Sequence, residues 1–431
     1  MKKIKITPSK LSGEITIPPS KSMAHRAIIC ASLSSESSTI SNIDFSEDII
    51  ATIDGMRALG ADIKIEESTL YISGKNLLDN SAQIKEIKNI FCNESGSTLR
   101  FLVPISLINE NRVRFTGKGN LGKRPLTPFY NIFDKQGIKY IYSDGVMDLM
   151  IDGKICSGEF ELEGNISSQF ISGLLFMLPL LKGNSKITIT SPLESKGYID
   201  LTLQMINLFG VSITNNNYQS FEIVGGQSYR GCNYVVEGDF SQAAFFLVAG
   251  AIGNDVVCKG LNINSLQRDK MALEFLQRIG AEIQINGSNI SVTKNKLEAI
   301  VMDGSECPDI MPVMAVVAAL CKGTSMMINA GRLRIKECDR LMAITKELGT
   351  LGANITELSD GLKIIGVDSF AGNTTVHSHK DHRIAMSIAI AATACNTPII
   401  LEEPDCVSKS YPSFWEDYKE MGGIIEVIDS E

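Results

Sequence analysis

One stretch near the N-terminus organises the fold; it reads Ile17-Pro18-Pro19-Ser20-Lys21-Ser22-Met23-Ala24-His25-Arg26. The two prolines exclude helix at Pro18, whereas residues 23–32 favour it, so a strand-to-helix switch is predicted near Ser20 to Ser22. The first N–H groups of that helix carry the positive end of its dipole, and Lys21 and Arg26 add two cations. This helix start is suited to a small anion; the alternative is a solvated basic start with a serine cap.

The bulk composition describes a globular chain of two to three domains. It has 431 residues, 44% hydrophobic and 21% charged, and a formal net charge of −8. That charge argues against nucleic-acid or membrane partners, so an anion site has to be local. The first residues alternate charged and β-branched side chains instead of forming an apolar signal, and we expect a cytoplasmic protein. The ten cysteines form no C-x-x-C pair and there are only four histidines, so neither a disulfide framework nor a metal site is predicted.

A repeat of 70 to 77 residues is the strongest pattern outside this stretch. In each copy a helical apolar pattern ends in glycine, and a strand follows; the six glycines are Gly60, Gly137, Gly210, Gly280, Gly352 and Gly422. After each glycine except the last, a second alternating strand returns through a polar turn. The sixth copy lacks that strand, and we expect residues 3–6 to supply it.

This closure predicts an α/β protein of two domains. Residues 21–236 should form one domain from repeats one to three, and residues 1–20 plus 237–431 the other from repeats four to six. The chain would cross between them twice, near residues 18–21 and near residues 237–241. A cleft between two such α/β domains is a natural ligand site.

Polar runs open several of the predicted apolar helices. In the first domain they are residues 93–100, with Gly96 and Arg100, residues 122–125, with Arg124, and residues 164–170, with Ser167, Ser168 and Gln169. Glycine lets the backbone approach a ligand closely, and the hydroxyl groups can cap the helix or donate to an oxyanion. Three such starts in one half are hard to explain by capping alone.

The second domain carries mixed charge at its helix starts. Asp309 precedes an apolar helix, where its carboxylate can either cap the helix or act as a base. Residues 332–340 hold six ionisable groups within nine positions, which either form a solvated face or project from a helix start. Residues 381–386 and 406–412 add two further segments with cations. In an acidic chain this recurrence of arginine and lysine is a focused field, suited to substrates with several carboxylate and phosphate charges.

Taken together, these motifs resemble the 5-enolpyruvylshikimate-3-phosphate synthase family. The resemblance spans the whole chain and rests on Pro-x-Ser-Lys-Ser-x-x-x-Arg at 18–26, Ser-Gly-Ser-x-x-Arg ending at Arg100, Arg124-Pro125, Ser167-Ser168-Gln169, Glu237-Gly238-Asp239, Pro308-Asp309, Lys336-Glu337-x-Asp339-Arg340, Asp381-His382-Arg383 and Ser408-Lys409. It implies six βαβαββ repeats in the enolpyruvyl transferase fold, an inside-out α/β barrel, with the active site in the cleft between the domains. It also implies 3-phosphoshikimate 1-carboxyvinyltransferase activity in the shikimate pathway of aromatic amino-acid (chorismate) biosynthesis.

The resemblance also implies roles for single residues. Catalysis would fall to Asp309 as base, with Glu337 or Lys21 protonating C3 of phosphoenolpyruvate. Shikimate-3-phosphate would bind Lys21, Ser22, Arg26, Ser167, Ser168, Gln169, Ser195, Tyr198, Asp309 and Lys336. Phosphoenolpyruvate would bind Lys21, Gly96, Arg124, Gln169, Arg340, Arg383 and Lys409, and the inhibitor glyphosate occupies the same place in the family. The resemblance implies neither metal nor cofactor, and we expect a monomer.

Two alternatives to this interpretation differ in chemistry. UDP-N-acetylglucosamine enolpyruvyl transferase shares the fold, but it carries a loop cysteine before the arginine equivalent to Arg124, and this chain has no cysteine between Cys92 and Cys156. A non-catalytic repeat protein, or an RNA-end-processing protein of related repeats, would not need Asp309 beside Lys336 and Glu337. Arg332 departs from the asparagine of many family members, and we assign it no role.

Overall fold

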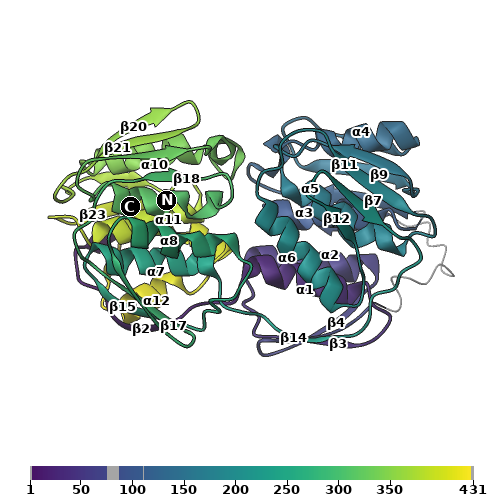
Figure 1. Ribbon diagram of the computed structural model, residues 1–431, viewed down its shortest axis with the longest axis horizontal. Helices are drawn as coiled ribbons and strands as arrows, with labels where there is room; N and C mark the ends of the chain where they lie inside the picture. Colours follow the sequence, from purple (N-terminus) through teal and green to yellow (C-terminus); the bar gives the residue numbers. More distant parts are fainter. Residues whose placement is uncertain (1, 75–86, 110, 429–431) are drawn as a thin grey trace. The chain divides into compact units, whose positions relative to one another are not determined.

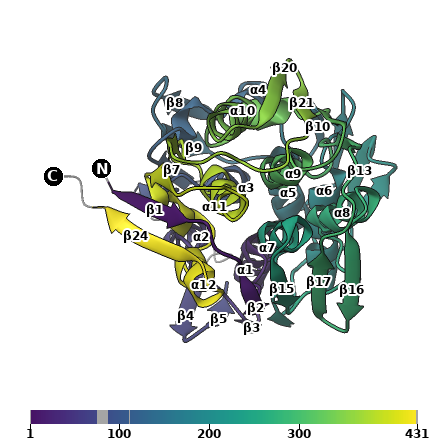
Figure 2. The ribbon, with the colours of Figure 1, turned by 90° about the vertical axis from the view of Figure 1, so that its left-hand side faces the viewer.

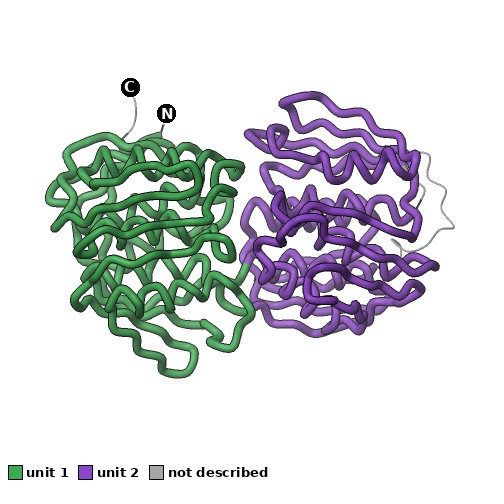
Figure 3. The backbone as a smooth tube through the Cα atoms, turned by 45° about the horizontal axis from the view of Figure 1, so that its top comes forward, with its two compact units in different colours: residues 1–20, 237–431 green, residues 21–236 purple. Residues whose placement is uncertain are grey.

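The computed structural model of the chain describes residues 2–74, 87–109 and 111–428. These residues divide into two compact units, residues 1–20 with 237–431 (unit 1) and residues 21–236 (unit 2), coloured separately in Figure 3. Each unit holds its own hydrophobic core, and each is described by itself.

Strands of the described residues form six four-stranded sheets, three in each unit, all with the same pairing pattern. In unit 2 the sheets contain β14 (Asn233–Val235), β3 (Ser38–Ser41), β5 (Thr69–Ser73) and β4 (Asp62–Glu66); β6 (Lys88–Phe91), β7 (Asn111–Thr116), β9 (Asp148–Gly153) and β8 (Lys139–Tyr142); and β10 (Glu159–Leu162), β11 (Ser185–Ile189), β13 (Ser220–Ile223) and β12 (Thr214–Asn216). The first pair in each order is parallel and the other two pairs are antiparallel.

Unit 1 repeats this pattern. Its sheets contain β2 (Ser12–Thr16), β15 (Asp255–Lys259), β17 (Asn289–Thr293) and β16 (Glu282–Asn286); β18 (Val301–Asp303), β19 (Thr324–Ile328), β21 (Gly361–Ile365) and β20 (Asn354–Leu358); and β22 (Thr375–His377), β23 (Ile399–Glu402), β1 (Lys3–Thr7) and β24 (Ile424–Ile428).

The N-terminal strand completes the sixth repeat, as the sequence predicts. β1 pairs antiparallel with β23 on one side and with β24 on the other, so that Ile4 faces Leu401 and Val427. Counted from the parallel pair, β1 is therefore the third strand of its sheet, the position that β5, β9, β13, β17 and β21 hold in the other sheets.

The strand before each inter-domain crossing pairs within its own unit, although the helix that follows it belongs to the other unit. β2 lies just before the first helix of unit 2 in the chain, yet it pairs in parallel with β15 of unit 1. Conversely, β14 lies just before the first helix of unit 1 and pairs in parallel with β3 of unit 2. Beyond these strands Pro19 bridges Gly238, and the amide of Ser20 donates to the carbonyl of Glu237.

The helices lie inside each unit and the sheets outside, as Figure 2 shows for unit 1. The helices of unit 2 are α1 (Lys21–Ser32), α2 (Glu47–Leu59), α3 (Gly96–Ser106), α4 (Thr127–Gln136), α5 (Ser168–Met177) and α6 (Lys196–Leu208). Those of unit 1 are α7 (Phe240–Ile252), α8 (Met271–Arg278), α9 (Met311–Ala318), α10 (Arg340–Thr350), α11 (His382–Ala392) and α12 (Phe414–Glu420); α9 is labelled in Figure 2 and the others in Figure 1. This inside-out arrangement of six βαβαββ repeats confirms the predicted fold class.

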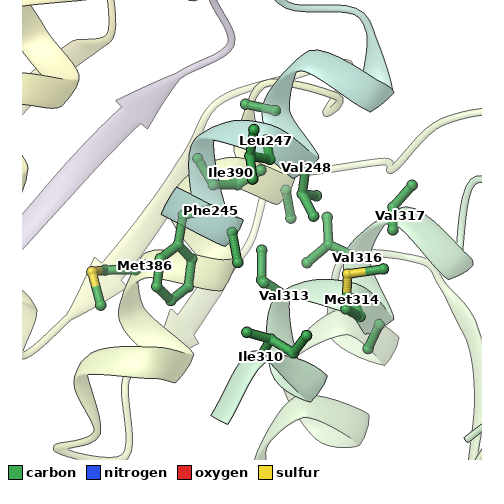
Figure 4. Packing of buried hydrophobic residues seen from close by; sticks show 14 of the residues in the cluster. Phe245, Leu247, Val248, Ile310, Val313, Met314, Val316, Val317, Met386 and Ile390 are labelled. Carbon is green, nitrogen blue, oxygen red and sulfur yellow. The ribbon is translucent and has the colours of Figure 1, made fainter. Parts of the chain in front are cut away.

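Three helices of unit 1 are buried on every side. All residues of α7, α9 and α11 are buried, and Figure 4 shows Phe245, Val313 and Met386 from the three helices within one cluster. A helix that is apolar all round can only be stable inside a core. Replacing Phe245 by alanine should therefore cost about 3–5 kcal/mol of unfolding free energy.

The six glycines of the repeat end helices in the left-handed conformation. Their φ angles lie between 69° and 119°, a region that glycine enters without a Cβ penalty. Each glycine turns the chain out of a helix and into the outer strands. Among the described residues, no helix is both long and apolar enough to cross a membrane.

Candidate active site

Unit 1 gathers the predicted ionisable residues at or near the ends of its helices. Asp309 lies in the short helix η4 (Pro308–Ile310) before α9, and Arg340 is the first residue of α10. Arg383 is the second residue of α11, and Lys409 ends the short helix η6 (Pro404–Lys409). The first N–H groups of a helix have no partner within the helix, so charged side chains placed there lie in a polar environment although they are buried.

Arg340 is the centre of this cluster and is only 1% exposed. Its Nε donates to Asp381 Oδ2 at 2.7 Å, its Nη1 to Asp309 Oδ1 at 2.9 Å, and its Nη2 to Glu337 Oε2 at 2.8 Å. Asp381 also caps α11 by accepting from the amide of Arg383 at 2.8 Å. One buried guanidinium therefore fixes three carboxylates, which is the fork geometry that favours arginine over lysine at such a site.

Three more cations complete the cluster. Lys336 Nζ lies 3.2 Å from Asp309 Oδ1, and Lys409 Nζ lies 3.2 Å from Glu337 Oε1. Arg383 Nη2 lies 3.9 Å from Asp309 Oδ2. These seven residues thus combine four cations with three carboxylates and carry an excess of positive charge. Such an excess attracts an anion that can share the cations.

Electrostatics hold Asp309 in its charged form. Burial alone would raise the pKa of its carboxyl, but Lys336, Arg383 and Arg340 outweigh that effect and hold the pKa well below its ordinary value. For Lys336, burial lowers the pKa despite the neighbouring Asp309. A carboxylate whose pKa is held this low is charged at neutral pH and is a weak base.

Asp309 does not hold the cap position of either helix. Cys307 occupies the cap position of η4 and Ile310 that of α9, whereas Asp309 lies within the first turn. Its carboxylate contacts cations of α10 and α11. Asp309 is therefore not the cap residue of either helix, and its acid–base role stays a prediction.

Unit 2 brings together the predicted residues around Gly96. A Cβ built at Gly96 would lie 2.6 Å from Arg124 Nη1, so this guanidinium rests against the start of α3. Gln169 is fixed here by two hydrogen bonds: its Nε2 donates to Ser97 Oγ at 2.8 Å, and its Oε1 accepts from Arg100 Nη1 at 2.8 Å. Two guanidinium groups and an oriented amide thus face one glycine, an arrangement suited to a small anion.

A second set in unit 2 centres on Arg26 of α1. This buried side chain donates to Thr202 Oγ1 at 2.9 Å, to the carbonyl of Ser22 at 2.7 Å and to the carbonyl of Tyr198 at 2.9 Å. Burial lowers the pKa of Arg26 to about 10, so it remains charged at neutral pH. The guanidinium is thereby aimed by backbone carbonyls between α1 and α6.

The other predicted residues of unit 2 lie at neighbouring helix starts. Ser167 caps α5, its Oγ accepting from the amide of Gln169 at 3.3 Å, and Ser168 is the first residue of that helix. Ser195 precedes α6 with a left-handed φ of 53°, a strained state for a non-glycine residue. Lys21 donates to Asp48 Oδ2 at 2.8 Å.

Sequence reasoning missed two hydrogen-bond partners of the predicted site residues. Arg100 and Asp381 orient Gln169 and Arg340, although sequence reasoning assigned them no individual role. Their places in the quoted motifs were the available signal. Within residues 332–340, Arg334 fits the alternative of a solvated charged face. Its Nη1 lies 2.9 Å from Asp339 Oδ2 and 2.6 Å from Glu357 Oε1, so it pairs outside the buried cluster. Among the described residues, no group of three or more His, Cys, Asp or Glu side chains could hold a metal ion.

Known proteins share both this fold and this sequence. The solved EPSP synthase of Acinetobacter baumannii has a TM-score of 0.81 at 27% identity, with all of both chains covered. The enolpyruvyl transferase NikO of Streptomyces tendae has a TM-score of 0.79 at 14% identity, over 100% of this chain and 99% of the other, which shows the fold alone. The fold is therefore that of the enolpyruvyl transferases.

Sequence comparison narrows this class. Residues 6–418 match the family described as EPSP synthase (3-phosphoshikimate 1-carboxyvinyltransferase). A 3-phosphoshikimate 1-carboxyvinyltransferase of Clostridium perfringens is 60% identical over 427 residues, covering 99% of this chain and 100% of the relative. The chain belongs to the EPSP synthase family, which confirms the predicted resemblance.

Proposed function

We propose that this chain transfers the enolpyruvyl group of phosphoenolpyruvate to the 5-hydroxyl of shikimate-3-phosphate and releases phosphate. The family membership carries the reaction, which belongs to aromatic amino-acid biosynthesis through chorismate. The observation that best supports the site is the buried cluster of unit 1, where Asp309 and Glu337 both contact Arg340. Two carboxylates held among cations provide acid–base groups next to an anion site.

Phosphoenolpyruvate would occupy positions that both units supply. Arg340, Arg383 and Lys409 of unit 1 would hold its carboxylate and phosphate, in place of part of their present contacts with carboxylates. In unit 2, Arg124, the backbone of Gly96, Gln169 and Lys21 would contact it. The position of Arg124 supports this assignment. Its guanidinium lies so close to Gly96 that a side chain at position 96 would touch it, so a ligand there could contact both the cation and the backbone of Gly96.

Shikimate-3-phosphate would bind chiefly to unit 2. Ser22 and Arg26 would hold its carboxylate, and Tyr198 would pack against its ring. Ser167, Ser168 and Ser195 would donate to its phosphate, together with Lys336 of unit 1, while Gln169 and Lys21 would contact it beside phosphoenolpyruvate. The support is local: three serines lie at or beside the starts of α5 and α6, where unpaired N–H groups favour a phosphate.

The chemistry needs one base and one acid. Asp309 would accept the proton of the 5-hydroxyl as its oxygen attacks C2 of phosphoenolpyruvate, while Glu337 or Lys21 delivers a proton to C3. The tetrahedral intermediate then loses a C3 proton and its phosphate, which leaves the enolpyruvyl ether. Arginine and lysine side chains stabilise the charge that builds on the departing phosphate.

Substrate binding would itself activate Asp309. Its pKa lies well below the ordinary value because Lys336, Arg383 and Arg340 outweigh the effect of burial. When substrate phosphate and carboxylate groups share those cations, the carboxylate loses stabilisation and its proton affinity rises. The base would thus become strong only when both substrates are in place.

Two further features belong to this proposal. Since the residues assigned to each substrate come from both units, the substrates would bring the two sets together, and closure would exclude water from the intermediate. We also infer a cytoplasmic monomer.

A phosphate-release assay tests the function directly. We expect phosphate only when shikimate-3-phosphate and phosphoenolpyruvate are both present, and none with either alone. Turnover with UDP-N-acetylglucosamine in place of shikimate-3-phosphate would support the related transferase instead. No turnover with either acceptor would overturn an enolpyruvyl transfer function.

A further inference from the structure

A short segment before α11 carries a histidine pair that the proposed chemistry does not use. His377 ends β22, and the loop that follows contains Ser378, His379 and Lys380. His379 and Lys380 have φ angles of 54° and 57°, a left-handed conformation that side chains other than glycine rarely adopt. Two consecutive residues in this state need contacts that hold them there.

Glu347 of α10 provides those contacts. Its side chain is only 3% exposed; its Oε1 lies 2.7 Å from His379 Nε2, and its Oε2 accepts from the amide of His377 at 3.0 Å. Burial would raise the pKa of Glu347, but these hydrogen bonds hold it below its ordinary value, so the carboxylate is charged. Because a charged carboxylate can only accept, His379 Nε2 carries the proton and donates.

His377 fixes the other side of the same histidine. Its Nδ1 accepts from the amide of His379 at 2.6 Å, and its Nε2 lies 3.1 Å from Glu403 Oε2. The two imidazole rings meet edge to face, with centroids 5.1 Å apart. The loop is therefore tied to α10 through Glu347 and to the start of η6 through Glu403.

The loop leads directly into the candidate active site. The amide of Asp381 donates to the carbonyl of Ser378 at 3.0 Å, and Asp381 in turn fixes Arg340 and caps α11 beside Arg383. α10 and α11 are thus joined twice, once by the pair Arg340–Asp381 at their starts and once by Glu347–His379. The second link joins Glu347, which lies seven residues after Arg340 in α10, to His379, which lies two residues before Asp381.

We propose that His379 is a positioning residue for the phosphoenolpyruvate site. By donating to Glu347, it holds the left-handed loop in register, which places Asp381 and through it Arg340 and Arg383. This role rests on the proposed function, since those two arginines are its assigned ligands for phosphoenolpyruvate. His379 touches no substrate in this scheme and acts only through Asp381.

Asparagine at position 379 separates the side-chain bond from the backbone conformation. Asparagine tolerates left-handed φ well, but its shorter side chain cannot reach Glu347 from this position. Glutamine can place an amide N–H near the position of His379 Nε2 and should restore the bond. Lys380→Ala, at an exposed neighbour in the same loop, is the matched control.

Steady-state kinetics should then show a selective effect. We expect His379→Asn to raise KM for phosphoenolpyruvate roughly 10-fold while KM for shikimate-3-phosphate changes less than about 2-fold, because misplacing two cations weakens one ligand. His379→Gln should recover most of the loss, and Lys380→Ala should match the wild type. Equal changes in both KM values, or no rescue by glutamine, would overturn the proposal.

Amide exchange provides a readout independent of turnover. In the unliganded full chain, the amides of Asp381 and Arg383 should exchange faster in His379→Asn than in wild type or His379→Gln. Unchanged exchange would overturn the proposal even if the wild type proved inactive with both substrates. Conversely, an active wild type with an unaffected His379→Asn variant would refute the positioning role and leave the proposed function standing.

Discussion

Replacing Gly96 by alanine should weaken glyphosate more than phosphoenolpyruvate. The added Cβ would lie 2.6 Å from Arg124 Nη1 and 3.1 Å from Arg100 Nη1, whereas ordinary contact begins at 3.4 Å. The tip of Arg124 therefore has to retreat by roughly 0.8 Å, the difference between 3.4 Å and 2.6 Å. Since the end of an arginine side chain is flexible, the protein should absorb this shift with at most about 0.5 kcal/mol of lost stability.

The bound ligands should feel the change more strongly than the protein does. Both would lose part of their contact with the displaced guanidinium, but the longer glyphosate would also meet the methyl group. Forcing a methyl group into a packed site costs about 1–3 kcal/mol, which corresponds to a roughly 5- to 150-fold loss of affinity. We expect the inhibition constant of glyphosate to rise by a factor in this range and KM for phosphoenolpyruvate to rise by less.

The assay is phosphate release with glyphosate varied against phosphoenolpyruvate, on the wild type and on Gly96→Ala. Gly349→Ala is a suitable control, because a Cβ at this exposed position of α10 would meet only Ile355, at 3.8 Å. It should leave both constants unchanged. An equal loss for the two ligands would refute the steric reasoning and leave Gly96 as an ordinary helix-start glycine.

Three other predictions test the base, the closure and a buried histidine. Asp309→Asn should reduce kcat by roughly 10²-fold or more, because an amide cannot accept the proton; near-normal turnover would rule out Asp309 as the base. Shikimate-3-phosphate should reduce the radius of gyration in small-angle scattering, since a ligand that binds both units favours their closed state, and an unchanged value would argue against closure. Burial lowers the pKa of His25 to about 3. The unfolded chain therefore binds more protons below pH 6.5, and this site should cost about 2 kcal/mol of stability between pH 7.5 and pH 5. Urea unfolding of the wild type and His25→Asn at both pH values checks this, and equal pH dependence would contradict it.

Much of the fold follows from local sequence rules. A glycine at each helix end and alternating strands after it are short-range signals, and their regular spacing was enough to predict six repeats. Even the place of β1 follows, because the sixth copy lacks one strand. The pairing of β2 with β15 and of β14 with β3 does not follow from the strand pattern, because alternation specifies which face is buried and leaves the partner strand open.

The candidate site, like the fold, could be predicted from the sequence only in part. Helix starts with cations were visible in the sequence, and Arg340 and Arg383 lie there. The sequence could not separate Arg340, which is buried among carboxylates, from Arg334, which pairs with Glu357 near the surface. That distinction depends on residues brought close by the fold. The link from Glu347 to His379 spans 32 residues and has the same origin.

The pairing of β1 and β2 constrains the order in which the chain can fold. Unit 2 is one continuous segment, and all its strands have been synthesised once residue 236 has left the ribosome. Unit 1 cannot finish until β23 and β24 emerge, because β1 lies between them, with Lys3 opposite Ile428. Two early strands must therefore remain unpaired or loosely paired while several hundred residues are added. Closing so long a loop is slow, so unit 1 should be the last part of the protein to fold and the part most dependent on the whole chain.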